Sequence, residues 1–154
     1  MSELPDPGSR APFVVREYVR WGDVDIVGII RYDAYLRFYQ LAESELFRAA
    51  GLGYHETLER FGVTLPRKVM HAEFVSPPTL EEELEVRTWV DRVGTTSMRL
   101  NFDIYGLGGA RRAFGHLVVV CVDARTLQKR PIPPEALARL APWTIEAEPD
   151  VSGR

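Results

Sequence analysis

The sequence predicts an α+β fold in which an antiparallel five-stranded sheet is wrapped around one long central helix. Residues 33–50 carry apolar side chains at helical spacing over about half of the helix circumference. From residue 63 onward the hydrophobic period changes to two, which is typical of strands with one buried face. One strand, a long apolar helix and then four strands joined by short turns form a single sheet that covers a single helix.

Length and composition indicate one domain. The chain has 154 residues, of which 45% are apolar, and we expect the domain at 13–142 between flexible tails at 1–12 and 143–154. The net charge of −3, with mixed signs, does not indicate a nucleic acid or an anionic membrane as partner. The N-terminus has no apolar signal region, and no stretch approaches the ~18 to 20 apolar residues of a membrane span. We therefore expect a cytoplasmic protein.

The central helix is expected at 33–50. Asp33 can serve as its N-cap or as a favourable anion in the first turn, and Gly51 followed by Leu52 suits a left-handed C-terminal cap with an apolar contact. A narrow polar stripe is formed by Arg37, Gln40, Ser44 and Arg48. The wide apolar arc comprises Tyr35, Phe38, Tyr39, Ala42, Leu46, Phe47, Ala49 and Ala50. An arc this wide predicts that other elements surround the helix.

The remaining elements follow from turn residues and alternation. The predicted strands are 13–21, 65–76, 80–93, 96–104 and 111–123, with helices at 54–61 and 135–140. The near-continuous apolar run at 117–122 predicts a strand buried on both faces. Cys121 lies in that run and is the only cysteine, so no intrachain disulfide is possible. We expect it to be a small buried side chain rather than a reactive thiol.

Two acids stand one residue apart at Asp23 and Asp25, followed by Gly28, just before the helix. One interpretation is that both acids only cap turns, since Asp readily bonds to nearby backbone. The other interpretation is that one of these acids takes part in catalysis. A carboxylate held beside a helix N-terminus lies near free backbone N–H groups that can stabilise an oxyanion.

The segment W-G-D-V-D-I-V-G-I-I-R-Y-D-A-Y-L-R-F at 21–38 resembles the hotdog-fold acyl-CoA thioesterases of the 4-hydroxybenzoyl-CoA thioesterase type, including the YbgC-like branch. The shared pattern is an aromatic residue, a small residue, D-x-D, two residues, Gly, an apolar run and then the central helix, which begins near a Tyr or His. The similarity continues more weakly to about residue 142. It implies the hotdog fold, at least a homodimer or homotetramer, and an active site at the subunit interface. There the loop of one chain would face the helix end and strands of the other.

The resemblance also implies roles for single residues. It assigns the catalytic carboxylate to Asp25, the backbone N–H that polarises the thioester carbonyl to Tyr32, and the loop glycine to Gly28. Asp25 would either activate a water molecule or attack the carbonyl itself. The sequence departs from the family at Gln40, where relatives usually carry an acid, and at 78–80, where Pro-Thr-Leu replaces a common Gly-Asp. Substrate specificity therefore does not carry over.

The implied substrate is an acyl or aryl thioester of coenzyme A or of an acyl carrier protein, with no metal and no cofactor beyond the carrier itself. Glu43 falls inside the apolar arc, which suggests a buried or intersubunit hydrogen bond or a role in the active site. Basic residues that could bind coenzyme A phosphates, or lie as solvated charges at the rim, are Arg67, Lys68, Arg111, Arg112, Arg125, Lys129 and Arg130.

Two other functions remain open from sequence. One is a non-catalytic protein that binds acyl thioesters; the other is a hotdog dehydratase, although the His/Asp pairing of dehydratases has no recognisable counterpart. His55, His71 and His116 do not have the spacing of metal ligands, and His116 is expected to be a hydrogen-bonded core or interface residue.

Overall fold

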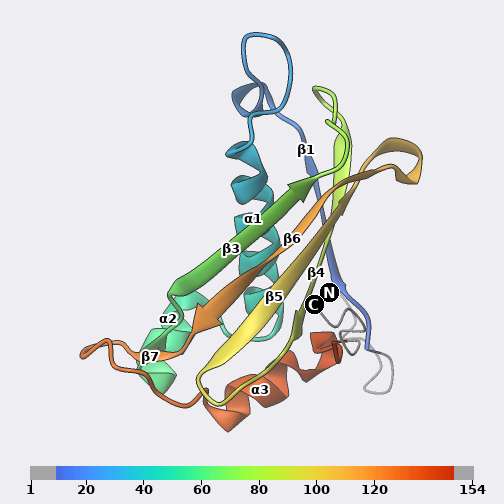
Figure 1. Cartoon of the computed structure of the whole chain (residues 1–154). Coiled ribbons are helices and arrows are strands. Elements are labelled where there is room, and N and C mark those ends of the chain that lie inside the picture. Colours follow the sequence, from blue (N-terminus) through green and yellow to red (C-terminus); the bar gives the residue numbers. More distant parts are fainter. Residues whose placement is uncertain (1–9, 148–154) are drawn as a thin grey trace, which may run out of the picture.

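The computed structural model describes residues 10–147 and contains a five-stranded antiparallel sheet with the order β1-β4-β5-β6-β3 (Figure 1). Its strands are β1 (Phe13–Tyr18), β3 (Arg67–Phe74), β4 (Glu83–Asp91), β5 (Ser97–Tyr105) and β6 (Arg111–Val120). All five predicted strands are present; four are shorter than predicted, and β5 has the predicted length but begins and ends one residue later. Residues 1–9 and 148–154, which hold most of the two predicted tails, lie outside the described residues.

Helices and short turns complete the chain. They are α1 (Ala34–Ala49), α2 (Tyr54–Glu56) with the π-helical turn η2 (Thr57–Phe61), α3 (Pro134–Leu140), and the 3₁₀ turns η1 (Trp21–Asp23), η3 (Leu107–Gly109) and η4 (Ala141–Trp143). The sequence did not predict a second, two-stranded sheet, in which β2 (Val63–Thr64) pairs with β7 (Val122–Asp123). The predicted strand 111–123 is therefore divided at Cys121 between two sheets.

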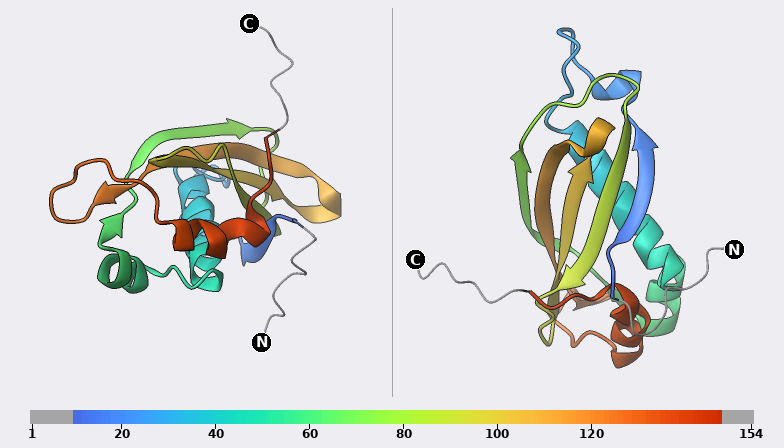
Figure 2. Two further views of the ribbon diagram at one scale, coloured as in Figure 1. Left: turned by 90° about the horizontal axis from the view of Figure 1, so that it is seen from below. Right: turned by 90° about the vertical axis from the view of Figure 1, so that its right-hand side faces the viewer.

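Helix α1 lies along one face of the main sheet, which curls over it (Figure 2). The predicted apolar arc is buried at Tyr35, Phe38, Tyr39, Ala42, Leu46 and Ala50, half-buried at Phe47 and exposed at Ala49. The predicted alternation also holds, because β4 and β5 bury every second side chain toward the helix. Tyr39 stacks on Phe102 with ring centroids 4.2 Å apart. A Cβ at Gly115 would lie 1.9 Å from the His71 carbonyl oxygen, so only glycine fits where β6 passes this point.

The ends of α1 differ in how they are capped. The helix begins one residue later and ends one residue earlier than the predicted range 33–50, with 16 residues. Asp33 occupies the N-cap position, but its side chain makes no capping bond and pairs with Arg31 at 3.0 Å. At the C-terminus the N–H groups of Gly51 and Leu52 donate to carbonyls of the last turn at 3.0 and 2.7 Å. Gly51 has φ +69°, so the predicted left-handed cap is confirmed.

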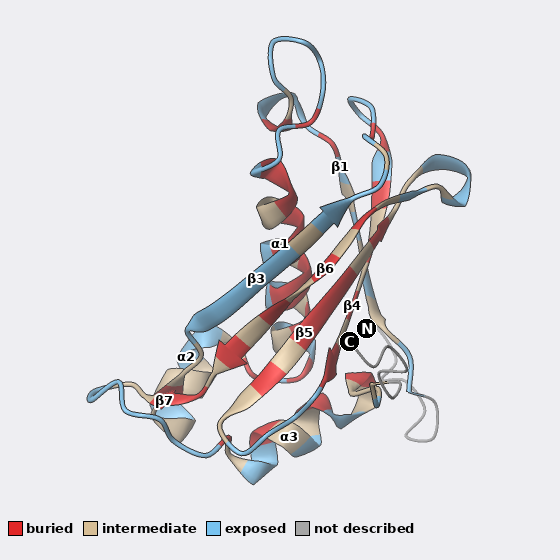
Figure 3. Ribbon diagram, viewed as in Figure 1, coloured by how far each residue is buried: buried red, intermediate tan, exposed pale blue. Residues whose placement is uncertain are grey.

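Strand β6 corrects one prediction. Leu117 and Val119 are buried, but Val118 and Val120 on the other face are only half-buried, so the strand is not buried on both sides. The physical reason is that no layer of the described chain covers the outer face of the sheet (Figures 2 and 3). Cys121 is completely buried, as predicted, and burial raises the pKa of its thiol.

Strand β3 is an open edge of the sheet. Seven of its eight residues are exposed, and the burial view shows this strand exposed almost throughout (Figure 3). Its exposed apolar side chains are Val69, Met70 and Phe74, at 41%, 49% and 55% of full exposure. An edge with free backbone groups and apolar side chains is suited to pairing with another strand.

The ordered contacts extend three residues past the predicted domain boundary at 142. Trp143 is buried against Phe13, with ring centroids 5.6 Å apart. The next two residues lie beside β4, where Thr144 forms a bridge with Val90 and the Ile145 N–H donates to the Val90 carbonyl at 2.9 Å.

A buried ion pair holds together the loops at the α1 N-terminal end of the sheet. Arg112 Nη2 donates to Glu82 Oε1 at 2.6 Å, and the Glu82 side chain is fully buried. The N–H groups of Leu107 and Thr79 each donate to this carboxylate at 2.8 Å. Burial alone would raise the pKa of Glu82, but these bonds, led by the one from Arg112, hold it below the ordinary value. Both Nη atoms of Arg112 thus bond within the fold, and its Nε is buried without a partner among the described residues.

We expect Arg112→Met to lower the free energy of unfolding by roughly 3–5 kcal/mol, because removing one partner of a buried ion pair leaves the other charge uncompensated. Arg111→Met is the matched control. Arg111 pairs with Asp103 at 2.8 Å on the outer face and is 43% exposed, so its loss should cost about 1 kcal/mol or less. Urea denaturation of both variants measures the difference, and equal losses would contradict this account.

Candidate active site

The loop at 21–32 projects beyond the N-terminus of α1 (Figure 1). Val24 and Ile30 form an antiparallel bridge across it. Within the bridge, the Asp25 N–H donates to the Ile29 carbonyl at 2.8 Å and the Gly28 N–H donates to the Asp25 carbonyl at 3.0 Å. Gly28 has φ +81°, a left-handed conformation that other residues rarely adopt, so this position favours glycine.

Asp25 uses one carboxylate oxygen to hold the turn. Its Oδ1 accepts hydrogen bonds from the N–H groups of Val27 at 2.8 Å and Ile29 at 3.2 Å. Its Oδ2 has no hydrogen-bond partner among residues 10–147. Asp25 therefore caps the turn with Oδ1, and its Oδ2 remains available to react with a substrate.

Asp23 is held differently. It is buried, and Arg37 donates to both of its oxygens, from Nε to Oδ1 at 2.8 Å and from Nη2 to Oδ2 at 2.5 Å. The Arg20 N–H adds a bond at 2.8 Å. Burial alone would raise the pKa of Asp23, but the bonds from Arg37 and Arg20 lower it. Since Arg37 also bonds to Glu17 and to the Tyr18 carbonyl, both at 3.1 Å, this carboxylate fastens the loop to α1 and β1.

Tyr32 lies two residues before α1, where backbone N–H groups have no partner within the helix. Its own N–H donates to no other group in the described part of the chain. Its side chain is 80% exposed. An incoming oxygen could therefore accept a hydrogen bond from this N–H at the positive end of the helix dipole.

An apolar cavity of about 250 Å³ lies beside this loop, where the start of α1 meets the end of β3. Tyr35 and Phe74 form part of its wall, with ring centroids 4.8 Å apart. Its other lining residues are Ile29, Ile30, Tyr32, Val75, Ser76 and Pro77.

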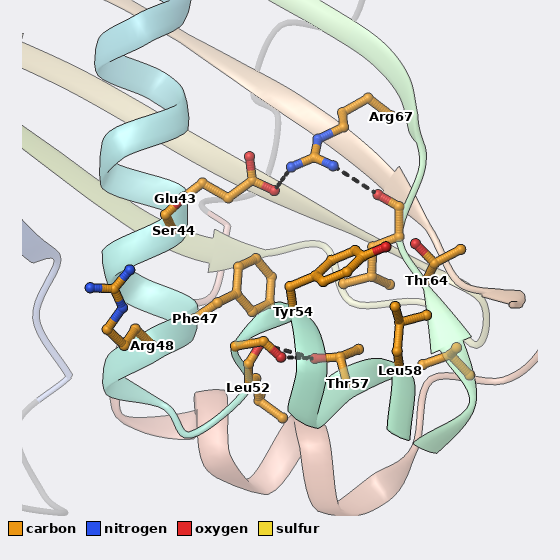
Figure 4. A pocket seen from close by; sticks show the side chains of 13 residues that line it. Glu43, Ser44, Phe47, Arg48, Leu52, Tyr54, Thr57, Leu58, Thr64 and Arg67 are labelled. Atoms are coloured by element: carbon orange, nitrogen blue, oxygen red, sulfur yellow. Dashed lines mark hydrogen bonds and ion pairs between the residues drawn. The ribbon is translucent and has the colours of Figure 1, made fainter. Parts of the chain in front are cut away.

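A second cavity, of about 330 Å³, lies between the C-terminal half of α1, the α2–η2 segment and the start of β3 (Figure 4). Glu43 projects into it from α1 and bonds to Arg67 Nη2 through Oε1. Glu43 is buried, whereas the Arg67 side chain is 52% exposed and also donates to the Leu65 carbonyl at 3.3 Å. The apolar wall is formed by Phe47, Leu52, Leu58, Val63 and Leu65.

The single chain does not bring all of the predicted site residues together. The loop residues Asp25, Gly28 and Tyr32 lie at one end of α1, whereas Glu43 lies roughly 15 Å along the helix axis from that end. The predicted basic residues are also dispersed. Lys68 is exposed on β3, Arg67 lines the second cavity, Arg111 is on the outer face, and Arg112 is paired with Glu82.

Sequence analysis missed the second cavity and the partners of Asp23 and Glu43. Arg37 lies fourteen residues from Asp23, and Arg67 lies twenty-four from Glu43. No local pattern links pairs so far apart. The only available signals were a charged residue inside an apolar arc at Glu43 and an Arg beside that arc at position 37.

His116 lies on the outer face of the sheet and stacks on His71, with ring centroids 5.1 Å apart. Burial, followed by the charges of Arg99 and His71, lowers the pKa of His116. Within residues 10–147 no group of three or more His, Cys, Asp or Glu side chains could hold a metal ion. No helix in the described part of the chain is both long and apolar enough to cross a membrane.

Comparison with known proteins identifies the family to which this chain belongs. The model of the thioesterase-like superfamily matches residues 19–140. A 1,4-dihydroxy-2-naphthoyl-CoA hydrolase from Thermosynechococcus vestitus is 25% identical over 93% of this chain and 97% of its own length. The acyl-CoA thioester hydrolase YbgC of Escherichia coli is 25% identical over 78% of this chain and 89% of its own length.

A solved structure extends the comparison to the fold. A thioesterase superfamily protein from Jannaschia sp. superposes with a TM-score of 0.79 at 28% identity, covering 94% of this chain and 99% of its own. The matched family region contains the 21–32 loop, α1 and all of the main sheet except β1.

We expect Asp23→Asn to lower the free energy of unfolding at pH 7 by about 1.5–3 kcal/mol, the usual contribution of hydrogen bonds to a charged group. The folded-state pKa of Asp23 lies below the ordinary value of 3.8. Its stabilising contribution is therefore complete above that value and is lost as the pH falls through the folded-state pKa. Denaturation at a series of pH values should show wild type and variant converging below about pH 4. A gap that stayed constant down to pH 2 would contradict this role.

Proposed function

We propose, since this chain belongs to the thioesterase-like superfamily, that it hydrolyses an acyl or aryl thioester of coenzyme A to the free acid and the thiol. The names of its relatives support this class of substrate, because one is a 1,4-dihydroxy-2-naphthoyl-CoA hydrolase and another an acyl-CoA thioester hydrolase. The observation that carries the proposal concerns two groups without a hydrogen-bond partner among residues 10–147: one oxygen of Asp25, in the loop before the helix, and the Tyr32 N–H at the helix N-terminus. An acyl carrier protein is a second candidate for the carrier, because its acyl thioester offers the same reactive group.

The chemistry needs one carboxylate and one oxyanion donor. In one route Asp25 attacks the thioester carbonyl carbon, the thiolate leaves, and water then hydrolyses the resulting mixed anhydride. In the other route Asp25 takes a proton from a water molecule that attacks the same carbon, and the thiol leaves. Both routes convert thioester and water to acid and thiol. In both, the Tyr32 N–H would stabilise the negative charge on the former carbonyl oxygen.

The substrate needs walls that one chain does not supply around Asp25. The loop is largely exposed, with Ile26 at 103%, Val27 at 75% and Trp21 at 77% of full exposure. Catalysis at a carboxylate is favoured in a water-excluded site. We therefore propose that a second copy of the chain covers this loop, as a homodimer or as part of a homotetramer.

The open edge of β3 supports one specific arrangement. Two copies of the same edge strand related by a twofold axis pair antiparallel, which places the Phe74 end of one beside the Arg67 end of the other. The 21–32 loop lies at the Phe74 end, because residues from both line the 250 Å³ cavity. Pairing would thus bring the loop of one protomer toward the Glu43 and Arg67 cavity of its partner.

The carrier is the remaining part of the substrate. Lys68 is exposed on β3 and has no ion-pair partner among the described side chains, whereas Arg111 already pairs with Asp103. Lys68 is therefore the better candidate for a coenzyme A phosphate. Its position beside the proposed subunit contact would place the carrier near that interface.

Replacement of Asp25 tests the mechanism. Asp25→Asn keeps the size and the loop hydrogen bonds but removes the basic and nucleophilic oxygen, so kcat should fall by about 10² to 10⁴ with little change in KM. Steady-state hydrolysis of a panel of short, medium, long and aromatic acyl-CoAs measures this. Asp23→Asn is the control, and any loss of rate there should follow its loss of stability. Binding without turnover by the wild type would instead indicate a non-catalytic acyl-thioester-binding protein.

Replacement of Val69 tests the subunit contact. Val69→Lys introduces a charge into the apolar edge that pairing would bury, so the protein should become monomeric and lose turnover with an unchanged fold. Val14→Lys alters an equally exposed valine, at 45%, on the opposite edge strand β1 and should change neither property. Light scattering and circular dichroism measure assembly and fold. A wild type that is monomeric at micromolar concentration, or an active monomeric variant, would refute the interfacial site.

A further inference from the structure

We infer that the Tyr35 hydroxyl is a second hydrogen-bond donor to the thioester carbonyl oxygen, in addition to the Tyr32 N–H, and that it acts from the cavity between the start of α1 and the end of β3. This inference rests on the proposed hydrolysis and adds to it a catalytic residue that contacts the reacting oxygen.

Helix α1 carries two buried tyrosines whose hydroxyl groups differ in access. Neither the Tyr35 nor the Tyr39 hydroxyl has a hydrogen-bond partner within residues 10–147. The Tyr39 oxygen is sealed from solvent, whereas the Tyr35 oxygen remains accessible. Tyr35 as a whole is only 4% exposed. A buried tyrosine usually bonds through its hydroxyl, so an accessible hydroxyl without a partner is available to a ligand.

The surroundings of Tyr35 connect it to the proposed chemistry. Tyr35 is the second residue of α1 and lines the 250 Å³ cavity. Aromatic side chains in helices point back over the preceding turn, so its ring extends toward Tyr32, which lines the same cavity. Ile29 also lines it, and the Ile29 N–H donates to Asp25 Oδ1 at 3.2 Å. The cavity therefore adjoins both the proposed oxyanion donor and the loop turn that holds the carboxylate.

The other polar side chains of the cavity are less suited to this role. Ser76 Oγ already donates to the Arg111 carbonyl at 2.8 Å and accepts from Arg112 Nη1 at 3.1 Å. The Tyr32 side chain is 80% exposed, so packing does not hold its hydroxyl in one position. The Tyr35 ring, by contrast, packs on Phe74 with centroids 4.8 Å apart. A donor fixed in this way needs no reorganisation when charge develops on a substrate.

The protonation state of Tyr35 suits a donor. Burial raises the pKa of its phenol, and the charge of Arg112 offsets only part of this effect, so the hydroxyl keeps its proton at neutral pH. A carbonyl oxygen has two lone pairs and can accept from the Tyr32 N–H and the Tyr35 hydroxyl together. Negative charge grows on this oxygen in both proposed routes. Both bonds therefore strengthen in the transition state, which raises kcat more than it lowers KM.

The first experiment removes each buried hydroxyl in turn. Tyr35→Phe keeps the ring, so kcat on the best acyl-CoA should fall by about 10²- to 10³-fold, the usual loss for one oxyanion donor, with KM changed by less than about threefold. Tyr39→Phe makes the same change at the sealed hydroxyl, four residues further along the helix, and should keep wild-type kcat. Urea denaturation verifies that both variants are folded. Equal losses of kcat in the two variants would overturn the inference.

The second experiment observes the carbonyl directly. Ketone analogues of acetyl-CoA and benzoyl-CoA, in which a methylene group replaces the sulfur, keep the carbonyl and cannot be hydrolysed. Infrared difference spectroscopy of the ¹³C-labelled carbonyl detects hydrogen bonds to its oxygen as a shift to lower frequency. The bound carbonyl band should lie at higher frequency in Tyr35→Phe than in wild type or Tyr39→Phe. Affinity for the analogue should fall by less than about 10-fold, as expected for one neutral hydrogen bond.

The two measurements separate this inference from the proposed function. Wild-type turnover that persists in Tyr35→Phe overturns the inference and leaves the hydrolase standing. A carbonyl band that depends on Tyr35, without turnover of any thioester, overturns the hydrolase and leaves Tyr35 as the carbonyl donor. A band at the same frequency in all three proteins, or no binding of either analogue, overturns the inference whatever the turnover.

Discussion

The bidentate bond between Arg37 and Asp23 is the interaction on which the geometry of the candidate site depends. It joins the start of the 21–32 loop to the first turns of α1, and through Glu17 and the Tyr18 carbonyl it also holds the end of β1. Because both oxygens of Asp23 accept hydrogen bonds from the protein, a substrate would compete with those bonds for this acid. The neighbouring acid Asp25 is positioned by this anchor but spends only one oxygen on the loop. Asp23 thus anchors the loop, and Asp25 keeps one oxygen available for a substrate.

Much of the fold could be predicted from the sequence because its signals are local. The alternation of β4 and β5, the polar stripe of α1 and the glycine at position 51 all depend on neighbours within a few residues. Errors arose where long-range packing decided the outcome. The apolar run at 117–122 predicted burial on both faces, yet nothing in the described chain covers the outer side of β6. The switch of the chain from β6 to β7 depends on pairing with Val63–Thr64, which lies almost sixty residues earlier.

The candidate site, like the fold, could be predicted only where its residues lie close together in the sequence. The loop motif is contiguous, and its glycine has the left-handed conformation that a tight turn requires, so Asp25, Gly28 and Tyr32 could be placed together from sequence. The cavity at Glu43 could not, because its walls come from α1, the α2–η2 segment and the start of β3. The basic residues show the same limit. Sequence supplied Arg67, Lys68, Arg111 and Arg112 as equivalent charges, and only tertiary pairing distinguishes the buried Arg112 from the exposed Lys68.

Several acids of the described chain have both carboxylate oxygens bonded to the protein, and these acids hold the fold together. Glu17 and Asp103, which are only partly exposed, have protein hydrogen bonds to both oxygens, as do the buried acids Asp23 and Glu82. A carboxylate saturated in this way is a poor base and a poor acceptor for a ligand, because a new bond must displace an existing one. Asp25 and Glu43 each keep one oxygen without a partner among residues 10–147; Asp25 lies in the loop before α1, and Glu43 lies in the C-terminal half of the helix. In the proposed antiparallel pairing of two β3 edges, the Asp25 loop of one protomer would approach the Glu43 side chain of its partner.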